Sequence, residues 1–229
     1  MTLELNRIYQ GDCLDLMREM GDKSVDLVLT DPPYGILNKM GWKNQPNKKI
    51  GCALQIDHSA VDYVKWDKKP STEYFSEIFR ISKNQIIFGG NYFELPSSQC
   101  WIVWDRDNGD CDFADAELAW TSFASSVRIF KYRWQGMIQE DMAHKEKREH
   151  PTQKPLPLMM WCLEKYSKPG ITVLDPFLGS GTTAVACKKL GRNFIGIEKE
   201  PAYVAIAEKR LEKVNNHKIT DFFNEGVNP

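Results

Sequence analysis

The sequence predicts an α/β fold, in which a mostly parallel sheet is covered by helices on both faces. Short apolar runs such as Val25–Thr30 alternate with longer segments of helical periodicity, and this alternation is typical of parallel sheets. Charged or glycine-rich turns follow some of these runs, at the strand ends where such sheets bind ligands. The 229 residues suit one domain, 1–229, with insertions at about 35–70 and 105–150.

Strands and helices alternate in the first half of the chain. The strands are short apolar runs that stop at turn-forming residues. They are expected at 5–9, 25–30, 85–88 and 101–104. One expected helix carries the apolar pattern of residues 14–20, and another runs from Ser71 or Thr72 to Ser82.

The second half begins with two alternating runs, 117–121 and 127–134, which predict antiparallel strands. The polar segment 135–150 shows no periodicity and is expected to be a loose loop. Regular elements then resume. Helices are expected at 156–166, 182–190 and 202–214, and strands at 171–174 and 193–197.

The tetrapeptide Asp31-Pro32-Pro33-Tyr34 directly follows the expected strand 25–30. Its two prolines have no N–H donor and fix the backbone, so their carbonyls can only accept hydrogen bonds. Asp31 and the Pro32 carbonyl could accept both hydrogens of an exocyclic amine, while Tyr34 stacks on the ring that carries it. The structural alternative is an ordinary Pro-Pro turn with an exposed tyrosine.

A second candidate site lies in 171–183, which has the pattern of a strand, a glycine-rich turn and a helix start. Gly179 and Gly181 would let a ligand approach the backbone, and the helix start adds N–H donors. Glu198 follows Asp175 by 23 residues, close to the spacing at which nucleotide-binding units place an acid on the ribose. Alanine replaces the third glycine of G-x-G-x-x-G, which disfavours a dinucleotide and a dehydrogenase.

Composition narrows the class of protein. The longest apolar runs are too short to cross a membrane, and the N-terminus lacks a signal-peptide pattern. The six cysteines include no C-x-x-C pair, which indicates reduced thiols inside a cell and disfavours a zinc site. No metal is expected, and the expected location is the cytoplasm.

Two local clusters of basic residues stand out against a net charge of −1. The segment 35–69 holds seven lysines against three aspartates, and 128–154 holds seven basic residues against four acidic ones. Both segments also contain aromatic residues, among them Trp42 and Trp134. Basic charge interleaved with aromatic rings is typical of nucleic-acid binding, although a solvated loop explains either segment alone.

Together, the tetrapeptide 31–34 and the segment Phe177-Leu178-Gly179-Ser180-Gly181 resemble the amino-group DNA methyltransferases of the β arrangement, in which D-P-P-Y precedes F-x-G-x-G. Gly11-Asp12, 150–155 and Glu198 also match this family. The resemblance implies a Rossmann-like, S-adenosylmethionine-dependent methyltransferase fold with circularly permuted motif order. It implies double-stranded DNA as partner, a bacterial or phage-infected cell, and the insertions as DNA-contacting regions. A homodimer and a cognate restriction endonuclease are further expected partners.

The resemblance also implies roles for individual residues. Asp12 would lie against the adenine of the cofactor, Thr152 and Lys154 would help to enclose its methionine, and Glu198 would bind its ribose. The expected catalytic residues are Asp31, Pro32, Pro33 and Tyr34. The expected residues for S-adenosylmethionine are Asp12, Thr152, Lys154, Asp175, Phe177, Gly179, Ser180, Gly181, Thr182 and Glu198.

The expected reaction is methylation of the N6 amine of an adenine that has been flipped out of the duplex. Hydrogen bonds to Asp31 and Pro32 would localise the amine lone pair, so positioning is expected to dominate catalysis. Asp at position 31 favours adenine in this family, but the N4 amine of cytosine fits the same acceptors. RNA methylation and a non-catalytic partner subunit remain as alternatives, although RNA enzymes usually reverse the motif order.

Overall fold

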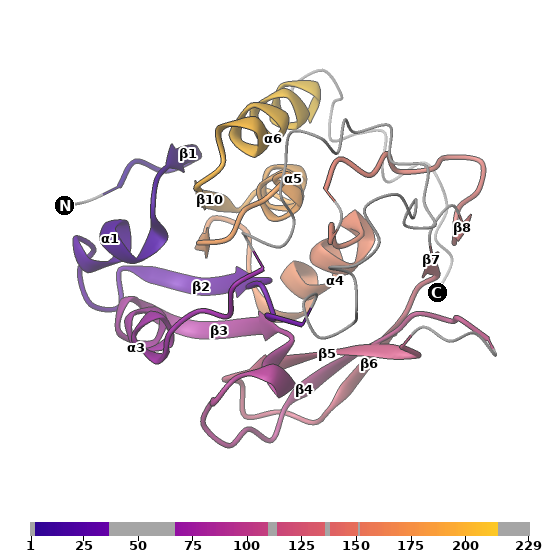
Figure 1. Cartoon of the computed structure of the whole chain (residues 1–229), viewed down its shortest axis with the longest axis horizontal. Helices are drawn as coiled ribbons and strands as arrows, with labels where there is room; N and C mark the ends of the chain where they lie inside the picture. Colours follow the sequence, from indigo (N-terminus) through magenta and orange to yellow (C-terminus); the bar gives the residue numbers. More distant parts are fainter. Residues whose placement is uncertain (1–2, 37–66, 110–113, 136–137, 151, 215–229) are drawn as a thin grey trace.

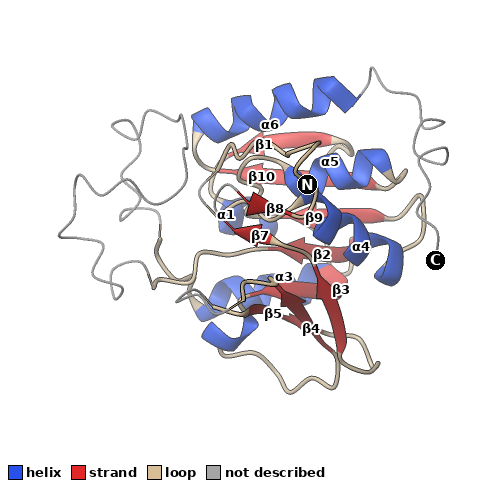
Figure 2. Cartoon of the chain, turned by 90° about the vertical axis from the view of Figure 1, so that its right-hand side faces the viewer, coloured by secondary structure: helices blue, strands red, loops and turns tan. Residues whose placement is uncertain are grey.

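A computed structural model describes residues 3–36, 67–109, 114–135, 138–150 and 152–214 of the chain. Its main sheet has the strand order β1-β10-β9-β2-β3-β5-β4-β6, and β7 and β8 form a separate pair. Figure 1 shows this sheet with α4, α5 and α6 beyond one face and α1 and α3 beyond the other. In Figure 2 the same helices flank the stacked strands. The expected α/β layering is confirmed.

Five parallel strands form the larger part of the sheet. They are β1 (Arg7–Gln10), β10 (Asn193–Glu198), β9 (Thr172–Asp175), β2 (Val25–Thr30) and β3 (Ser82–Phe88). In β2, Leu27 and Leu29 pack into one core and Val28 into the other. The strand is therefore apolar on both faces, which explains why its sequence is a continuous apolar run and not an alternating one.

The remaining strands are β5 (Ala116–Thr121), β4 (Trp101–Asp105) and β6 (Arg128–Lys131). As expected for 117–121, β5 is antiparallel to its neighbours β3 and β4. The expectation of an antiparallel strand over 127–134 is wrong, because β6 pairs with β4 in parallel. β5 already pairs with β3 on one side and β4 on the other, so β6 adds to the outer edge of β4. Because β4 is antiparallel to β5, a strand that reverses the direction of β5 is parallel to β4.

The helices cover the two faces of the sheet. Leu158, Cys187 and Ala207 come from α4 (Leu156–Tyr166), α5 (Thr182–Lys189) and α6 (Pro201–Val214), and they share one core. Met17 and Ile78 come from α1 (Cys13–Arg18) and α3 (Thr72–Ile81), and they share the other core. A short 3₁₀ turn, η2 (Gly90–Tyr92), follows β3.

The segment 135–150 is more ordered than its composition indicates. β7 (Trp134–Gln135) and β8 (Ile138–Gln139) pair in an antiparallel hairpin. Gln139 then exchanges hydrogen bonds of 2.8 Å with the backbone N–H and carbonyl of Glu146. The expected loose loop is therefore wrong for the described residues, because side chains supply the hydrogen bonds that a regular element would provide. Within the described part of the chain, no helix is long and apolar enough to span a membrane.

Candidate active site

A cavity of about 910 Å³ opens at the carboxyl ends of the parallel strands, where β2, β9 and β10 end at Thr30, Asp175 and Glu198. This is the edge at which open α/β sheets bind ligands. The cavity brings together nearly all of the residues proposed from the sequence. Those that line it are Asp12, Asp31, Pro32, Pro33, Tyr34, Thr152, Lys154, Asp175, Phe177, Gly179, Ser180, Thr182 and Glu198.

Gly181 is the exception, because it does not line the cavity. Its φ is +85°, and a Cβ atom built on it would lie 2.7 Å from the Cβ of Ala207 in α6. A side chain here would be strained and would push α6 away from the start of α5. This glycine therefore serves helix packing, and its role in cofactor binding stays a prediction.

Asp31 is held by hydrogen bonds to both of its carboxylate oxygens. The Tyr34 hydroxyl donates to Oδ1 at 2.6 Å, and the Lys154 ammonium donates to Oδ2 at 2.6 Å. Burial raises the pKa of the Asp31 carboxyl, while the charge of Lys154 opposes that rise. Asp31 thus faces the cavity as a preorganised acceptor whose two oxygens already have donors.

Tyr34 is fixed by the segment that follows β3. Its ring stacks on Tyr92 with centroids 4.9 Å apart, at an interplanar angle of 20°. Gly89 lies so close that a Cβ atom there would sit 2.1 Å from the Tyr34 ring, and its φ is +66°. Any residue with a side chain at position 89 would displace the ring. The alternative of a freely exposed tyrosine after a Pro-Pro turn is therefore wrong.

Lys154 carries a buried positive charge between two carboxylates. Its side chain is 6% exposed, and its ammonium lies 2.6 Å from Asp31 and 3.2 Å from Glu117. Burial acts to lower the pKa of Lys154, but the two carboxylates outweigh it and raise that pKa overall. Lys154 is therefore a permanent cation at neutral pH.

Glu117 lines the cavity but was not predicted from the sequence. The residues predicted from the sequence lie mainly at the carboxyl ends of strands, whereas Glu117 lies near the start of β5, which is antiparallel to β3. An antiparallel strand brings its amino end to the edge where parallel strands end. A search of the amino ends of the alternating segments for charged residues would have found it.

Glu198 accepts backbone hydrogen bonds at both oxygens. The N–H of Gly179 donates to Oε2 at 2.7 Å, and the N–H of Glu200 donates to Oε1 at 2.8 Å. A carboxylate has about four acceptor sites, so two remain for hydroxyl groups of a ligand. Burial raises the pKa of the Glu198 carboxyl. Its position ties the glycine-rich turn to the end of β10.

Asp175 holds strands and helix together in addition to lining the cavity. The hydroxyls of Thr30 and Thr183 donate to its carboxylate at 2.8 and 2.6 Å, and the N–H of Phe177 donates at 3.1 Å. Burial raises the pKa of Asp175 to about 7. Because β2, β9 and α5 meet at this carboxyl, its main interactions are with the protein itself.

Asp12 and Thr152 line the same cavity. Asp12 caps α1 by accepting a hydrogen bond from the N–H of Leu14 at 3.0 Å, and it lies 3.2 Å from Lys199. Thr152 lies 3.2 Å from a ring nitrogen of His150. Burial lowers the pKa of His150 to about 3, so this imidazole is neutral.

Comparison with known proteins connects this arrangement to a family. The family model N6_N4_Mtase, described as DNA methylase, matches residues 103–209. The Type II methyltransferase M.HinfI of Haemophilus influenzae is 30% identical over 258 aligned residues, which cover 92% of this chain and 69% of the relative. The chain belongs to the N6/N4 DNA methyltransferases. The resemblance found in the sequence is thereby confirmed.

Two further proteins extend the comparison. The Type II methyltransferase M2.MboI of Moraxella bovis is 26% identical, with 90% of this chain and 88% of the relative covered. The crystal structure of the M1.HpyAVI–SAM complex is 26% identical, with a TM-score of 0.55 and coverage of 90% of this chain and 99% of that chain. The methyltransferase therefore has the fold of this enzyme class, with the tetrapeptide of Asp31 ahead of the glycine-rich turn.

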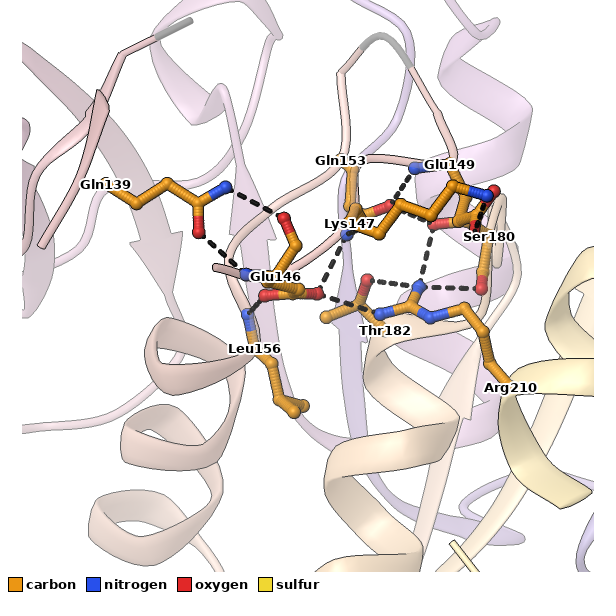
Figure 3. A network of polar contacts seen from close by, with 9 residues as sticks. All are labelled: Gln139, Glu146, Lys147, Glu149, Gln153, Leu156, Ser180, Thr182 and Arg210. Carbon is orange, nitrogen blue, oxygen red and sulfur yellow. Dashed lines mark hydrogen bonds and ion pairs between the residues drawn. The ribbon is translucent and has the colours of Figure 1, made fainter. Parts of the chain in front are cut away.

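A polar network fastens the segment 139–156 of the methyltransferase to its glycine-rich turn (Figure 3). The Ser180 hydroxyl donates to Gln153 at 3.0 Å, and Arg210 donates to the Ser180 carbonyl at 2.8 Å and to the Thr182 hydroxyl at 3.1 Å. Glu146 pairs with Arg210 at 2.9 Å and accepts from the N–H of Leu156 at 2.9 Å. Ser180 and Thr182, expected to contact the cofactor, therefore also hold this network together.

The basic segment 128–154 is less cationic than its composition indicates. Lys131 and Arg133 both pair with Asp107. The charge of Lys154 is balanced inside the cavity by Asp31 and Glu117. Trp134 is 1% exposed and packs in the core, with the Arg148 guanidinium 4.7 Å from its ring. Trp134 is therefore not a surface ring for stacking on the duplex, although it lines the cavity. Most of the other basic segment, 37–66 with Lys48 and Lys49, lies outside the described residues.

Proposed function

We propose that this DNA methyltransferase transfers a methyl group from S-adenosylmethionine to the N6 amine of adenine in a flipped-out base. The observation that carries the proposal is the position of Asp31. Its carboxylate faces the same cavity as the Pro32 and Tyr34 of its tetrapeptide and as the glycine-rich turn. The enzyme thus has an amine acceptor and a nucleoside-binding turn in one space.

The residues of the second half of the cavity fit S-adenosylmethionine. Glu198 keeps acceptor capacity for two ribose hydroxyls, and Asp12, Phe177, Gly179, Ser180 and Thr182 line the same region. Thr152 and Lys154 line the same cavity and flank Gln153, which is hydrogen-bonded to Ser180 of the turn. When bound, S-adenosylmethionine supplies an electrophilic methyl group on a sulfonium.

The chain's own residues position the attacking amine. Asp31 and the Pro32 carbonyl accept its two hydrogens, which draws the nitrogen lone pair out of the ring and towards the methyl carbon. Tyr34 is held by Gly89 and Tyr92, so the ring that packs on the base is already oriented. This preorganisation lowers the entropic cost of alignment.

Double-stranded DNA is the expected substrate, and the target base must leave the stack to reach Asp31. We propose that residues near 35–70 and 105–150 contact the duplex. A homodimer and a cognate restriction endonuclease are proposed as further partners. The described cysteines 13, 100, 162 and 187 are free thiols, which agrees with a cytoplasmic location in a bacterium.

Nucleoside analysis tests the proposed base. Purified enzyme is incubated with unmethylated DNA and S-adenosylmethionine carrying an isotopically labelled methyl group, and the digested DNA is examined by mass spectrometry. Label in N6-methyladenine supports the proposal. Label in N4-methylcytosine would establish the second candidate, which the same acceptors of Asp31 and Pro32 permit. Label in RNA alone, in a parallel reaction, would exclude DNA as substrate.

A further inference from the structure

The ion pair between Asp31 and Lys154 raises a problem for the reaction proposed above. Both oxygens of Asp31 have donors, the Tyr34 hydroxyl at 2.6 Å and the Lys154 ammonium at 2.6 Å. An incoming amine needs one of these oxygens. An amine that approaches Oδ2 therefore competes with the Lys154 ammonium for the same oxygen.

Separating the Lys154 ammonium from Asp31 is unfavourable unless another anion pairs with that ammonium. The Lys154 side chain is 6% exposed, and the Asp31 side chain is 17% exposed. Leaving a buried ammonium without a counter-ion is strongly unfavourable, because the charge has lost its water and gained no partner. Lys154 would then stay on Asp31, and the base amine would have to share that oxygen with the ammonium.

Glu117 offers the second counter-ion. Its Oε2 lies 3.2 Å from the Lys154 ammonium and is buried, yet it accepts no hydrogen bond of good geometry from the described residues. Its Oε1 accepts from the Arg106 guanidinium at 3.3 Å, which fixes the carboxylate at the cavity wall. Oε2 therefore has an acceptor site left for the Lys154 ammonium, which already lies beside it.

We propose that Glu117 is a positioning residue that takes over the Lys154 ammonium when Asp31 accepts the target amine. The exchange keeps one ion pair in the buried site throughout and moves no proton. The inference rests on the proposed function, because it uses the amine-binding role of Asp31. It assigns Glu117 an effect on methyl transfer and none on cofactor binding.

The substitution Glu117→Gln tests this role, because it keeps the size of the side chain and removes its charge. Lys154 then has only Asp31 as a carboxylate partner, so the single-turnover rate of methyl transfer is expected to fall at least about tenfold. Calorimetry is expected to give an affinity for S-adenosylmethionine within about twofold of the wild type. Glu164→Gln, on the exposed face of α4, is the matched control and is expected to behave as the wild type.

A second comparison asks whether Glu117 acts through Lys154. In a Lys154→Gln background the ammonium is gone, so at saturating S-adenosylmethionine adding Glu117→Gln is expected to cause no further loss of the single-turnover rate. A further tenfold loss in that background would overturn the proposal. Should the Lys154→Gln protein not fold, the single variant decides alone. An unchanged rate in Glu117→Gln, or a loss of rate matched by a loss of cofactor affinity, would reject it.

Failure of this inference differs from failure of the proposed function. A wild-type enzyme that methylates adenine, together with a fully active Glu117→Gln variant, rejects only the exchange of ion pairs. A wild-type enzyme that leaves adenine unmodified rejects the proposed function, whatever the variant does. The same labelled-methyl assay reports both outcomes.

Discussion

At the scale of single residues, Asp31 is the side chain on which the proposed chemistry depends. Tyr34 and Lys154 hold its two oxygens, and Glu117 stands behind Lys154. Glu198 occupies an equivalent position in the cofactor half, because backbone N–H groups orient its carboxylate. Two carboxylates at the ends of β2 and β10 thus face one cavity with separate tasks.

Replacing Asp31 with alanine is expected to abolish methyl transfer and to leave cofactor affinity within a few-fold of the wild type. The substitution removes an interaction that strengthens in the transition state, and among the proposed cofactor residues it removes a contact of Lys154. Lys154 keeps Glu117 as a counter-ion, so the variant is expected to fold. Calorimetry that shows no binding of S-adenosylmethionine to the folded variant would contradict the role of Asp31.

Glu198→Ala is expected to weaken S-adenosylmethionine binding by roughly 1.5–3 kcal/mol, the loss typical of hydrogen bonds to a charged group. The variant also frees the N–H of Gly179, so the glycine-rich turn loses an anchor. Glu164→Gln serves again as the surface control. Isothermal titration measures the affinity, and wild-type binding in Glu198→Ala would place the ribose elsewhere.

At the scale of elements, the sequence predicts the parallel half of the sheet better than the antiparallel half. The apolar run Val25–Thr30 has the observed bounds of β2, because a strand buried on both faces has a distinctive composition. β6 was assigned the wrong direction, since pairing depends on which edge is free, and no local pattern encodes that. Glu117 was missed although an antiparallel strand was expected there, because its place in the cavity depends on which strands neighbour β5. The ion pair of Glu146 with Arg210 joins segments far apart in the sequence, so no local pattern encodes it either.

The carboxyl of Asp175 predicts a pH dependence of stability. Its pKa is about 7 in the folded protein against 3.8 in the reference state, so the native state binds more protons than the unfolded state between these pH values. Its contribution to the free energy of unfolding is therefore present at low pH and is lost as the pH rises from about 4 to about 7.

The variant Asp175→Asn isolates this contribution, because asparagine keeps the shape of the side chain but does not titrate. Urea denaturation at pH 5 and at pH 8 measures both proteins. The stability of the variant relative to the wild type is expected to improve as the pH rises. A difference that does not change with pH would mean that Asp175 stays ionised and that Thr30 and Thr183 compensate for its burial.

At the scale of the whole molecule, the orientation of the sheet decides which cations can reach DNA. In the strand register, Lys131 of β6 lies beside Asp105 of β4, at the edge that holds the cavity. Arg128 lies beside Ile102, towards the opposite edge. Arg133 is exposed and lies beyond Lys131. The sequence alone grouped all three residues, because charge counts carry no direction.

The double variant Lys131→Gln/Arg133→Gln is expected to weaken DNA binding and to reduce its salt dependence by about one unit of slope per lost phosphate contact. Asp107 then loses both partners, which lowers the local charge further. Arg128→Gln is the matched control, and it is expected to keep the wild-type slope. Fluorescence anisotropy at several salt concentrations measures the slopes, and equal slopes for all three proteins would place the DNA on another surface.

Long-read sequencing that reports modified bases, applied to DNA from cells that express this chain, tests the central claim most directly. The account predicts N6-methyladenine at one short recurring sequence, and no such modification in cells that express Asp31→Ala instead. Modified cytosine at a fixed sequence, or N6-methyladenine that persists with Asp31→Ala, would contradict it.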